Sequence, residues 1–234
     1  MVAQSFDPST PAQGPAAACD PAARVTRSLL GYGVLAGPFY VLVVLAQALL
    51  RSGFDLAHDD VSLLSNGAYG WVQRVNFGLT GLMVVACAVG MARALSGERG
   101  GTWGPRLLGL YGIGLIGAGI FSADPMNGFP PGTPDGRPAS VSAAGTLHLV
   151  SAGIGFLGLI VATFLLARYF AAHEMRTWAI GSALTGILFL LGFGGLASGS
   201  SSAAVVLGFW AALLIAWCWL AATSIYLYRR VGAA

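Results

Sequence analysis

The chain has 234 residues, of which 56% are hydrophobic and only 9% are charged, and its formal net charge is +3. In soluble domains about a quarter of the residues are charged. The composition of this chain therefore excludes a water-facing globular domain and indicates that lipid is the main solvent. The small positive charge is dispersed, with no arginine-rich run among aromatic residues, so nucleic acid is excluded as a partner. At this length we expect a single domain.

The N-terminal residues are rich in Ala, Pro and Ser and have no apolar periodicity. They predict a disordered cytoplasmic tail over residues 1–26, followed by a transmembrane domain over residues 27–230. The first apolar stretch is too long for the core of a signal peptide, and no cleavage site of small residues follows it. We therefore interpret that stretch as a membrane helix.

A helix needs about 20 apolar residues to cross a bilayer, and six stretches of the chain approach or exceed this length. They are residues 28–50, 71–95, 105–121, 143–170, 178–196 and 203–228. The third is the shortest and the richest in glycine, and the last carries Trp and Tyr residues that suit a membrane interface. The predicted fold is all-α: a polytopic membrane bundle of six transmembrane helices.

The twelve basic residues are all arginines, and their placement predicts the orientation. With both chain ends in the cytoplasm, nine arginines lie inside, and only Arg51, Arg74 and Arg137 lie outside. This bias follows the positive-inside rule. We therefore expect a multi-pass protein of a bacterial inner membrane, with its N- and C-termini inside.

Small residues recur at a spacing of four within the predicted helices. The pairs are Gly33 with Gly37, Ala86 with Gly90, Gly114 with Ala118, and Ser151 with Gly155. Such pairs allow helix backbones to approach closely in lipid. They predict a compact bundle and carry no functional information of their own.

Polar side chains are concentrated in the two predicted outer loops and at the adjacent helix ends. The candidate catalytic residues are Asp59, Asp60, Asp124 and His148. The candidate ligand-binding residues are Ser62, Trp71, Arg74, Asn76 and Asn127. All of them lie near the same membrane surface in the predicted topology, so a six-helix bundle can bring them together.

Arg74 and His148 are informative because each lies inside an apolar stretch. An ionisable group within a span is costly, so it faces the bundle interior or a wet cavity and has a partner. Asp59, Asp60 or Asp124 can supply the carboxylate for Arg74, and Asp124 can pair with His148. A purely structural ion-pair network that holds the outer loops is the alternative.

Metal binding and nucleophilic catalysis have weaker support. The histidines and aspartates could ligate a divalent ion, but no motif places two ligands on one helix face, and no CxxC occurs. No GxSxG frames Ser62 or Ser142, and Ser142 is better interpreted as the N-cap of the following helix. No P-loop or dinucleotide fingerprint appears, so no metal and no cofactor are predicted.

Three segments carry a resemblance to a known family: HDDVSLLSNGAYGWVQRVNFGLTGL, FSADPMNGFPPG and GTLHLVSAG. Together they resemble the bacterial membrane proteins catalogued as domain of unknown function 998, over residues 29–228. The family is distantly similar to the Frag1/DRAM/Sfk1 group. The resemblance implies a polytopic membrane protein and highlights several candidate residues, but it implies no reaction.

The sequence leaves three functions open. The first is binding of a lipid or apolar small molecule in an outward-facing cavity under the Asp/His/Arg cluster, because apolar pockets with a few polar groups suit amphiphiles. The second is a membrane-embedded enzyme acting on a lipid or isoprenoid, with an aspartate as general acid in the manner of a terpene cyclase. The third is a transporter. Membrane lipid is the expected partner, and the oligomeric state is not predicted.

Overall fold

The computed structural model describes residues 20–98 and 101–231, and these residues form an all-helical bundle. Its long helices are α1 (Pro21–Leu50), α2 (Gly70–Ala94), α3 (Trp103–Ile120), α4 (Ala143–Ala172), α5 (Arg176–Ala197) and α6 (Ala203–Val231). A short 3₁₀ helix, η1 (Val61–Ser65), lies in the loop between α1 and α2. The prediction of an all-α membrane bundle with six helices is confirmed.

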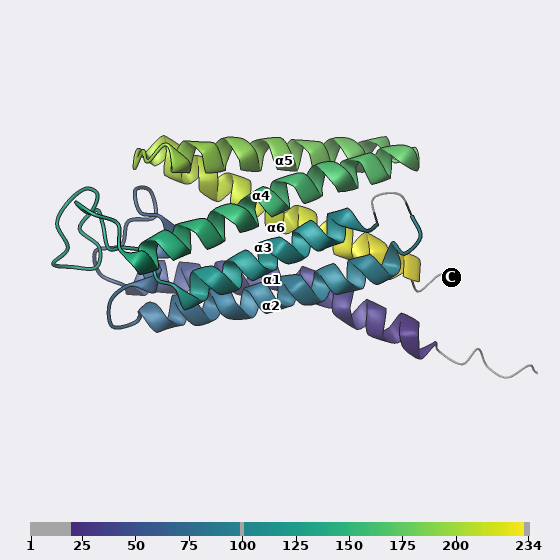
Figure 1. Cartoon of the computed structure of the whole chain (residues 1–234), viewed down its shortest axis with the longest axis horizontal. Coiled ribbons are helices and arrows are strands. Elements are labelled where there is room, and N and C mark those ends of the chain that lie inside the picture. Colours follow the sequence, from purple (N-terminus) through teal and green to yellow (C-terminus); the bar gives the residue numbers. More distant parts are fainter. Residues whose placement is uncertain (1–19, 99–100, 232–234) are drawn as a thin grey trace, which may run out of the picture.

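Five of the six helices are long and apolar enough to cross a membrane by length and composition alone. The exception is α3, which has 18 residues and is rich in glycine. At 1.5 Å per residue it is still about as long as the hydrocarbon core is thick. It packs between α2 and α4 along the bundle (Figure 1), so we count it as the sixth crossing.

The first helix begins earlier than the boundary that the sequence suggests. Asp20 caps it by accepting hydrogen bonds from the backbone N–H groups of Ala22 and Ala23, and Pro21 occupies the first turn. Both are favourable features of a helix N-terminus. Residues 21–26 are therefore helical, whereas the rest of the predicted tail, residues 1–19, lies outside the described residues.

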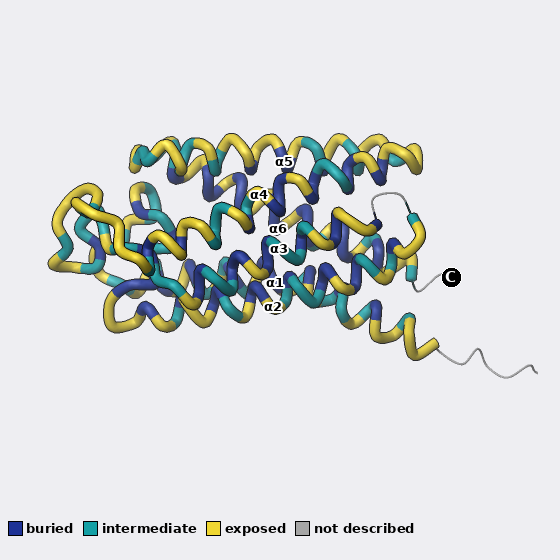
Figure 2. The backbone as a smooth tube through the Cα atoms, in the orientation of Figure 1, coloured by how far each residue is buried: buried dark blue, intermediate teal, exposed yellow. Residues whose placement is uncertain are grey.

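The six helices form a ring. Each packs mainly on its neighbours in sequence, and α6 packs on α1 to close the circle. Buried residues face inward, and exposed apolar residues cover the outside, most plainly along α5 (Figure 2). An apolar outer surface is what a lipid solvent requires. The centre of the ring is thus the natural place for a pocket.

Glycines set the close helix contacts in this ring. A Cβ on Gly114 of α3 would lie 2.7 Å from Cα of Gly155 in α4, and one on Gly37 of α1 would lie 2.8 Å from Cβ of Trp217 in α6. Both glycines belong to predicted small-residue pairs, so that interpretation is confirmed for them. A pairing that the pattern did not reveal joins Gly81 of α2 to Gly112 of α3.

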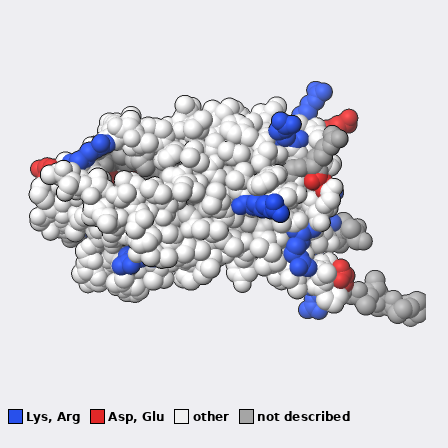
Figure 3. All heavy atoms as spheres, in the orientation of Figure 1, with Lys and Arg blue, Asp and Glu red and all other residues white. Residues whose placement is uncertain are grey.

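The two ends of the bundle differ. The connections α1–α2, α3–α4 and α5–α6 lie at one end, which we call the loop end; the described chain ends lie at the other, the terminus end (Figure 1). Most of the visible arginines gather at the terminus end (Figure 3). This distribution is the one on which the orientation was predicted, and the orientation itself stays a prediction.

Candidate functional site

A cavity of about 670 Å³ lies in the loop-end half of the ring. All six long helices contribute to its wall, and the loops before η1, after α3 and after α5 form its rim. Its deep wall is mostly apolar, with Leu115, Phe156, Phe193, Phe209 and Leu213. The volume lies within the range of about 300–1,000 Å³ that is typical of ligand pockets.

Aromatic side chains cross the ring at the inner end of this cavity. Tyr40 of α1 lies 5.5 Å from Trp217 of α6, and Trp217 lies 5.9 Å from Tyr111 of α3, between ring centroids. Tyr111 then contacts Phe156 of α4 at 6.2 Å, and Phe156 contacts Phe209 of α6 at 5.6 Å. Tyr40, Trp217 and Tyr111 form an aromatic layer on the terminus side of the cavity, whereas Phe156 and Phe209 lie in its wall.

The two adjacent aspartates before η1 have different surroundings. Asp60 is the N-cap of η1, where its Oδ1 accepts a hydrogen bond from the backbone N–H of Ser62 at 3.1 Å, and both residues line the cavity. Asp59 is 3% exposed, accepts from the backbone N–H of Asp55 at 2.8 Å, and is not part of the cavity wall. Burial raises the pKa of Asp59 above its usual range.

Asp124 belongs to the loop that follows α3, and its carboxylate lies at the N-terminal end of α4. Its Oδ2 accepts a hydrogen bond from the backbone N–H of Ser142 at 2.9 Å, and the Ser142 hydroxyl in turn accepts from the N–H of Gly145 at 2.9 Å. The prediction that Ser142 caps this helix is confirmed. A Cβ at position 145 would overlap the Asp124 carboxylate, so glycine allows the carboxylate to reach the positive end of the helix.

Arg74 and His148, the two ionisable residues within the apolar stretches, both contact the C-terminal end of α3. Its last carbonyl groups have no partner within the helix. Arg74 donates to the carbonyls of Gly119 and Ile120 at 3.0 and 2.9 Å, and His148 Nδ1 lies 3.2 and 2.9 Å from those of Ala118 and Phe121. The suggested carboxylate partners were therefore wrong: helix-end carbonyls take their place.

The nine candidate residues divide between the cavity and its surroundings. Those that line the cavity are Asp60, Ser62, Asp124, Asn127 and His148. Four do not: Asp59 is buried in the first loop, Arg74 caps α3, Trp71 is 62% exposed on the outside, and Asn76 is buried between α1 and α2. Five of the nine candidates therefore face one cavity, and their role there stays a prediction.

Asn76 belongs to a buried polar network between α1 and α2. Its Nδ2 donates to the carbonyl of Tyr40 and to Oε1 of Gln73, both at 3.2 Å. Gln47 of α1 donates to the same Gln73 oxygen at 2.8 Å. Buried amides need such partners, and hydrogen bonds between helices are a common solution in membranes. This contact supports a structural role for Asn76.

Sequence reasoning missed much of the cavity wall, including the polar side chains of Tyr40, Tyr111 and Arg137. Tyr40 and Tyr111 lie near the middle of two apolar spans, and a hydroxyl group at mid-span was a signal that could have identified them. Arg137 comes from the Pro/Gly-rich loop between α3 and α4, and its guanidinium packs against Gly199 in the α5–α6 loop. No local pattern indicates that contact, because it joins two loops far apart in sequence.

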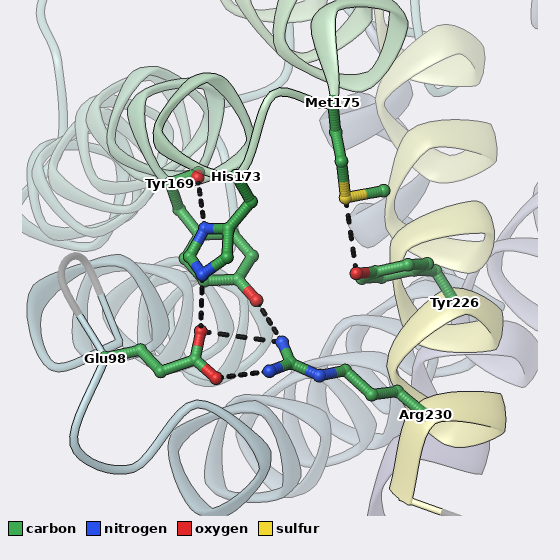
Figure 4. A network of polar contacts seen from close by, with 6 residues as sticks. All are labelled: Glu98, Tyr169, His173, Met175, Tyr226 and Arg230. Carbon is green, nitrogen blue, oxygen red and sulfur yellow. Dashed lines mark hydrogen bonds and ion pairs between the residues drawn. The ribbon is translucent and has the colours of Figure 1, made fainter. Parts of the chain in front are cut away.

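The terminus end contains a second polar cluster, but its side chains pair with one another (Figure 4). Glu98 forms an ion pair with Arg230, and Arg230 also donates to the hydroxyl of Tyr169. His173 Nε2 lies 3.2 Å from Glu98, and its Nδ1 lies 2.8 Å from the carbonyl of Tyr169. The cluster joins the α2–α3 loop to the ends of α4 and α6.

Among the described residues, metal ligands do not gather at either end of the bundle. Within residues 20–98 and 101–231, no group of three or more His, Cys, Asp or Glu side chains is close enough to hold an ion. His58 pairs with Asp55 at 2.9 Å on an exposed part of the first loop. Hydrogen bonds from Ala57 N–H and from His58 lower the pKa of Asp55.

Together, the helix ring, its apolar exterior and the internal pocket define a multi-pass membrane protein with a polar-rimmed cavity at one end. The chain belongs to the family described as protein of unknown function (DUF998), whose model matches residues 34–226. That range covers the cavity wall and the candidate residues. No curated protein and no solved structure matches the chain.

Proposed function

We propose that this protein binds a lipid or another apolar small molecule in the cavity of the loop end, on the outer side of a bacterial inner membrane. The observation that carries the proposal is the pocket itself: about 670 Å³, with apolar and aromatic walls, and rimmed by side chains that include Asp60, Asp124 and Arg137. An amphiphile fits this division, because its apolar part would contact the deep wall and its polar part the rim.

The position of the pocket supports a ligand taken from the membrane. Its wall uses helices that carry exposed apolar residues on their outer faces, so lipid would surround the helices that form it. Polar side chains that include Tyr40, Tyr111 and Arg137 also line the cavity. A bound molecule with a few polar atoms would satisfy them.

A matched pair of substitutions tests the proposal. Gly153→Leu adds bulk to the cavity wall, where a Cβ would have Phe193 as its nearest neighbour at 4.0 Å. Gly208→Leu makes the same change on the exposed side of α6, where a Cβ would meet nothing within 4 Å. Native mass spectrometry of protein extracted from membranes should show a bound apolar molecule in wild type and Gly208→Leu, and much less in Gly153→Leu. Equal occupancy in all three would contradict the proposal, as would an empty wild-type protein.

A membrane-embedded enzyme acting on a lipid or isoprenoid is the second candidate, since Asp60 and Asp124 both line the cavity. Both carboxylates, however, already accept hydrogen bonds from backbone N–H groups at helix starts, so each has a structural role as a helix cap. Asp59, whose burial raises its pKa, lies outside the cavity wall. If Asp60→Asn and Asp124→Asn left the ligand bound but changed the membrane lipid profile of the cell, catalysis would replace simple binding.

Transport is a weaker candidate. The cavity is lined by loop-end and mid-bundle residues, and the aromatic layer of Tyr40, Trp217 and Tyr111 separates it from the terminus end. A path through the protein would require these packed rings to move. The geometry therefore favours a pocket that is closed on one side.

A further inference from the structure

Two backbone carbonyls determine which nitrogen of His148 carries the hydrogen. Nδ1 lies 2.9 Å from the carbonyl oxygen of Phe121 and 3.2 Å from that of Ala118. A carbonyl can only accept, so Nδ1 must donate. In the neutral ring Nε2 is then a bare acceptor. His148 is 3% exposed and lines the cavity, and within the described residues Nε2 has no hydrogen-bond partner.

Two buried hydroxyl groups share the same cavity. Tyr40 and Tyr111 are 4% and 2% exposed, both line the wall, and neither hydroxyl is hydrogen-bonded to any part of the chain that the structure describes. Phe77 lies between Tyr40 and His148, with its ring centroid 6.1 Å from each of theirs. Tyr111 is joined to Tyr40 through Trp217, whose ring centroid lies 5.5 Å from that of Tyr40 and 5.9 Å from that of Tyr111. A phenol can donate and accept, whereas Nε2 here can only accept.

The Nε2 atom of His148 and the hydroxyl groups of Tyr40 and Tyr111 together favour one kind of ligand. The residues line the cavity, so a ligand whose polar group matches theirs gains affinity over one that leaves them unpaired. We propose that the pocket selects a lipid alcohol: an apolar molecule with a free hydroxyl group, which donates to His148 Nε2 and accepts from Tyr40 or Tyr111. Ethers, esters and carboxylates have no hydrogen to donate to Nε2. This inference rests on the proposed function, since it requires that the cavity binds an apolar molecule.

A competition experiment on the purified full-length protein tests the preference. The probe is tritium-labelled 1-hexadecanol in detergent micelles, displaced either by unlabelled 1-hexadecanol or by its methyl ether. The ether keeps the chain and the oxygen and loses only the donated hydrogen. We expect the ether to compete at least about tenfold more weakly, which is the loss of one hydrogen bond of about 1.4 kcal/mol.

The outcomes separate this inference from the proposed function. If the alcohol and the ether compete equally, the hydroxyl preference is overturned while binding in the cavity stands. If labelled alcohol shows no saturable binding at all, and native mass spectrometry finds no apolar ligand either, both are overturned. A strong preference for the alcohol supports both.

Substitutions assign the preference to these residues. His148→Asn keeps an N–H donor for the α3 carbonyls and removes Nε2, so the preference for alcohol over ether should fall to about onefold. His173→Asn makes the same change at the terminus end, 2.8 Å from a different carbonyl, and should leave the preference intact. If His148→Asn does not fold, Tyr40→Phe and Tyr111→Phe remove single hydroxyl groups while keeping the rings. Because the alcohol oxygen and the ether oxygen can both accept from a tyrosine, at least one of these variants should bind both competitors more weakly while the preference stays unchanged. Wild-type affinity for both competitors in both tyrosine variants would contradict their part in the site.

Discussion

The loop end and the terminus end of the bundle use similar polar residues in different ways. At the terminus end, Glu98 pairs with both Arg230 and His173, and these contacts join three segments of the chain. At the loop end, Asp124 and His148 bind backbone groups at helix ends and still line a cavity. At the terminus end the polar side chains use one another as partners. At the loop end they bind backbone groups, and polar atoms remain that a ligand can contact.

This difference teaches how a short membrane protein can keep a pocket without losing stability. Helix ends have unpaired backbone groups that must be satisfied, most of all where water is scarce. When side chains such as Asp124 and His148 satisfy them, the structural requirement and the polar lining of a pocket are met by the same residues. The comparison predicts that changes at the two ends have separable effects.

The largest effect is expected from Gly145→Val at the loop end. The new side chain would occupy the space of the Asp124 carboxylate and separate it from the N–H of Ser142. Overpacking of this kind costs about 1–3 kcal/mol, and here it should also weaken ligand binding. Thermal unfolding in detergent measures the loss. The exposed Ala143→Val, in the same turn, is the control, and equal stability of the two variants would contradict the described contact.

A smaller effect is expected at the terminus end. Glu98→Gln removes the carboxylate between Arg230 and His173, which are partly exposed, so the loss should be about 1 kcal/mol or less. Ligand affinity should stay at the wild-type value, because the cavity lies beyond the aromatic layer. Glu174→Gln changes an exposed carboxylate nearby and serves as the control. A loss of affinity in Glu98→Gln would show that the two ends are coupled.

The smallest effect is a difference in pH response. Burial raises the pKa of Asp59, so its contribution to stability is present at low pH and is lost as the pH rises from the usual Asp range through the folded pKa. Partial burial raises the pKa of Glu98, but hydrogen bonds from Arg230 and Tyr169 lower it overall. Its contribution is present above the usual Glu range and is lost as the pH falls through the folded pKa.

The two substitutions should therefore shift stability in opposite directions with pH. Relative to wild type, Asp59→Asn should gain stability as the pH rises through the acidic range, and Glu98→Gln should lose it, each by about 1 kcal/mol or less. Denaturant unfolding of both variants at several pH values between about 3 and 7 measures this difference. Parallel pH profiles for the two variants would show that the surroundings of one carboxylate are not as described.

Much of the fold could be predicted because lipid imposes simple rules. Long apolar stretches predicted the helices, and Gly37 and Gly114 marked close helix contacts. The site was harder because pairing at helix ends depends on three-dimensional placement. Charge alone suggested carboxylate partners for Arg74 and His148, whereas the α3 carbonyls that bind them carry no sequence signal. Arg137 was missed for the same reason, since its neighbour Gly199 belongs to another loop.

The central claim is that the loop-end cavity is the ligand site, and photolabelling tests it most directly. A single-chain alcohol that carries a diazirine in its chain would be irradiated with the protein in lipid nanodiscs, and the modified residues would be mapped by mass spectrometry. The account predicts adducts on the cavity wall, at Phe156, Phe193 or Phe209, that excess unlabelled alcohol prevents. Adducts confined to lipid-exposed residues such as Leu42, Leu79 and Leu191, unaffected by the competitor, would contradict it.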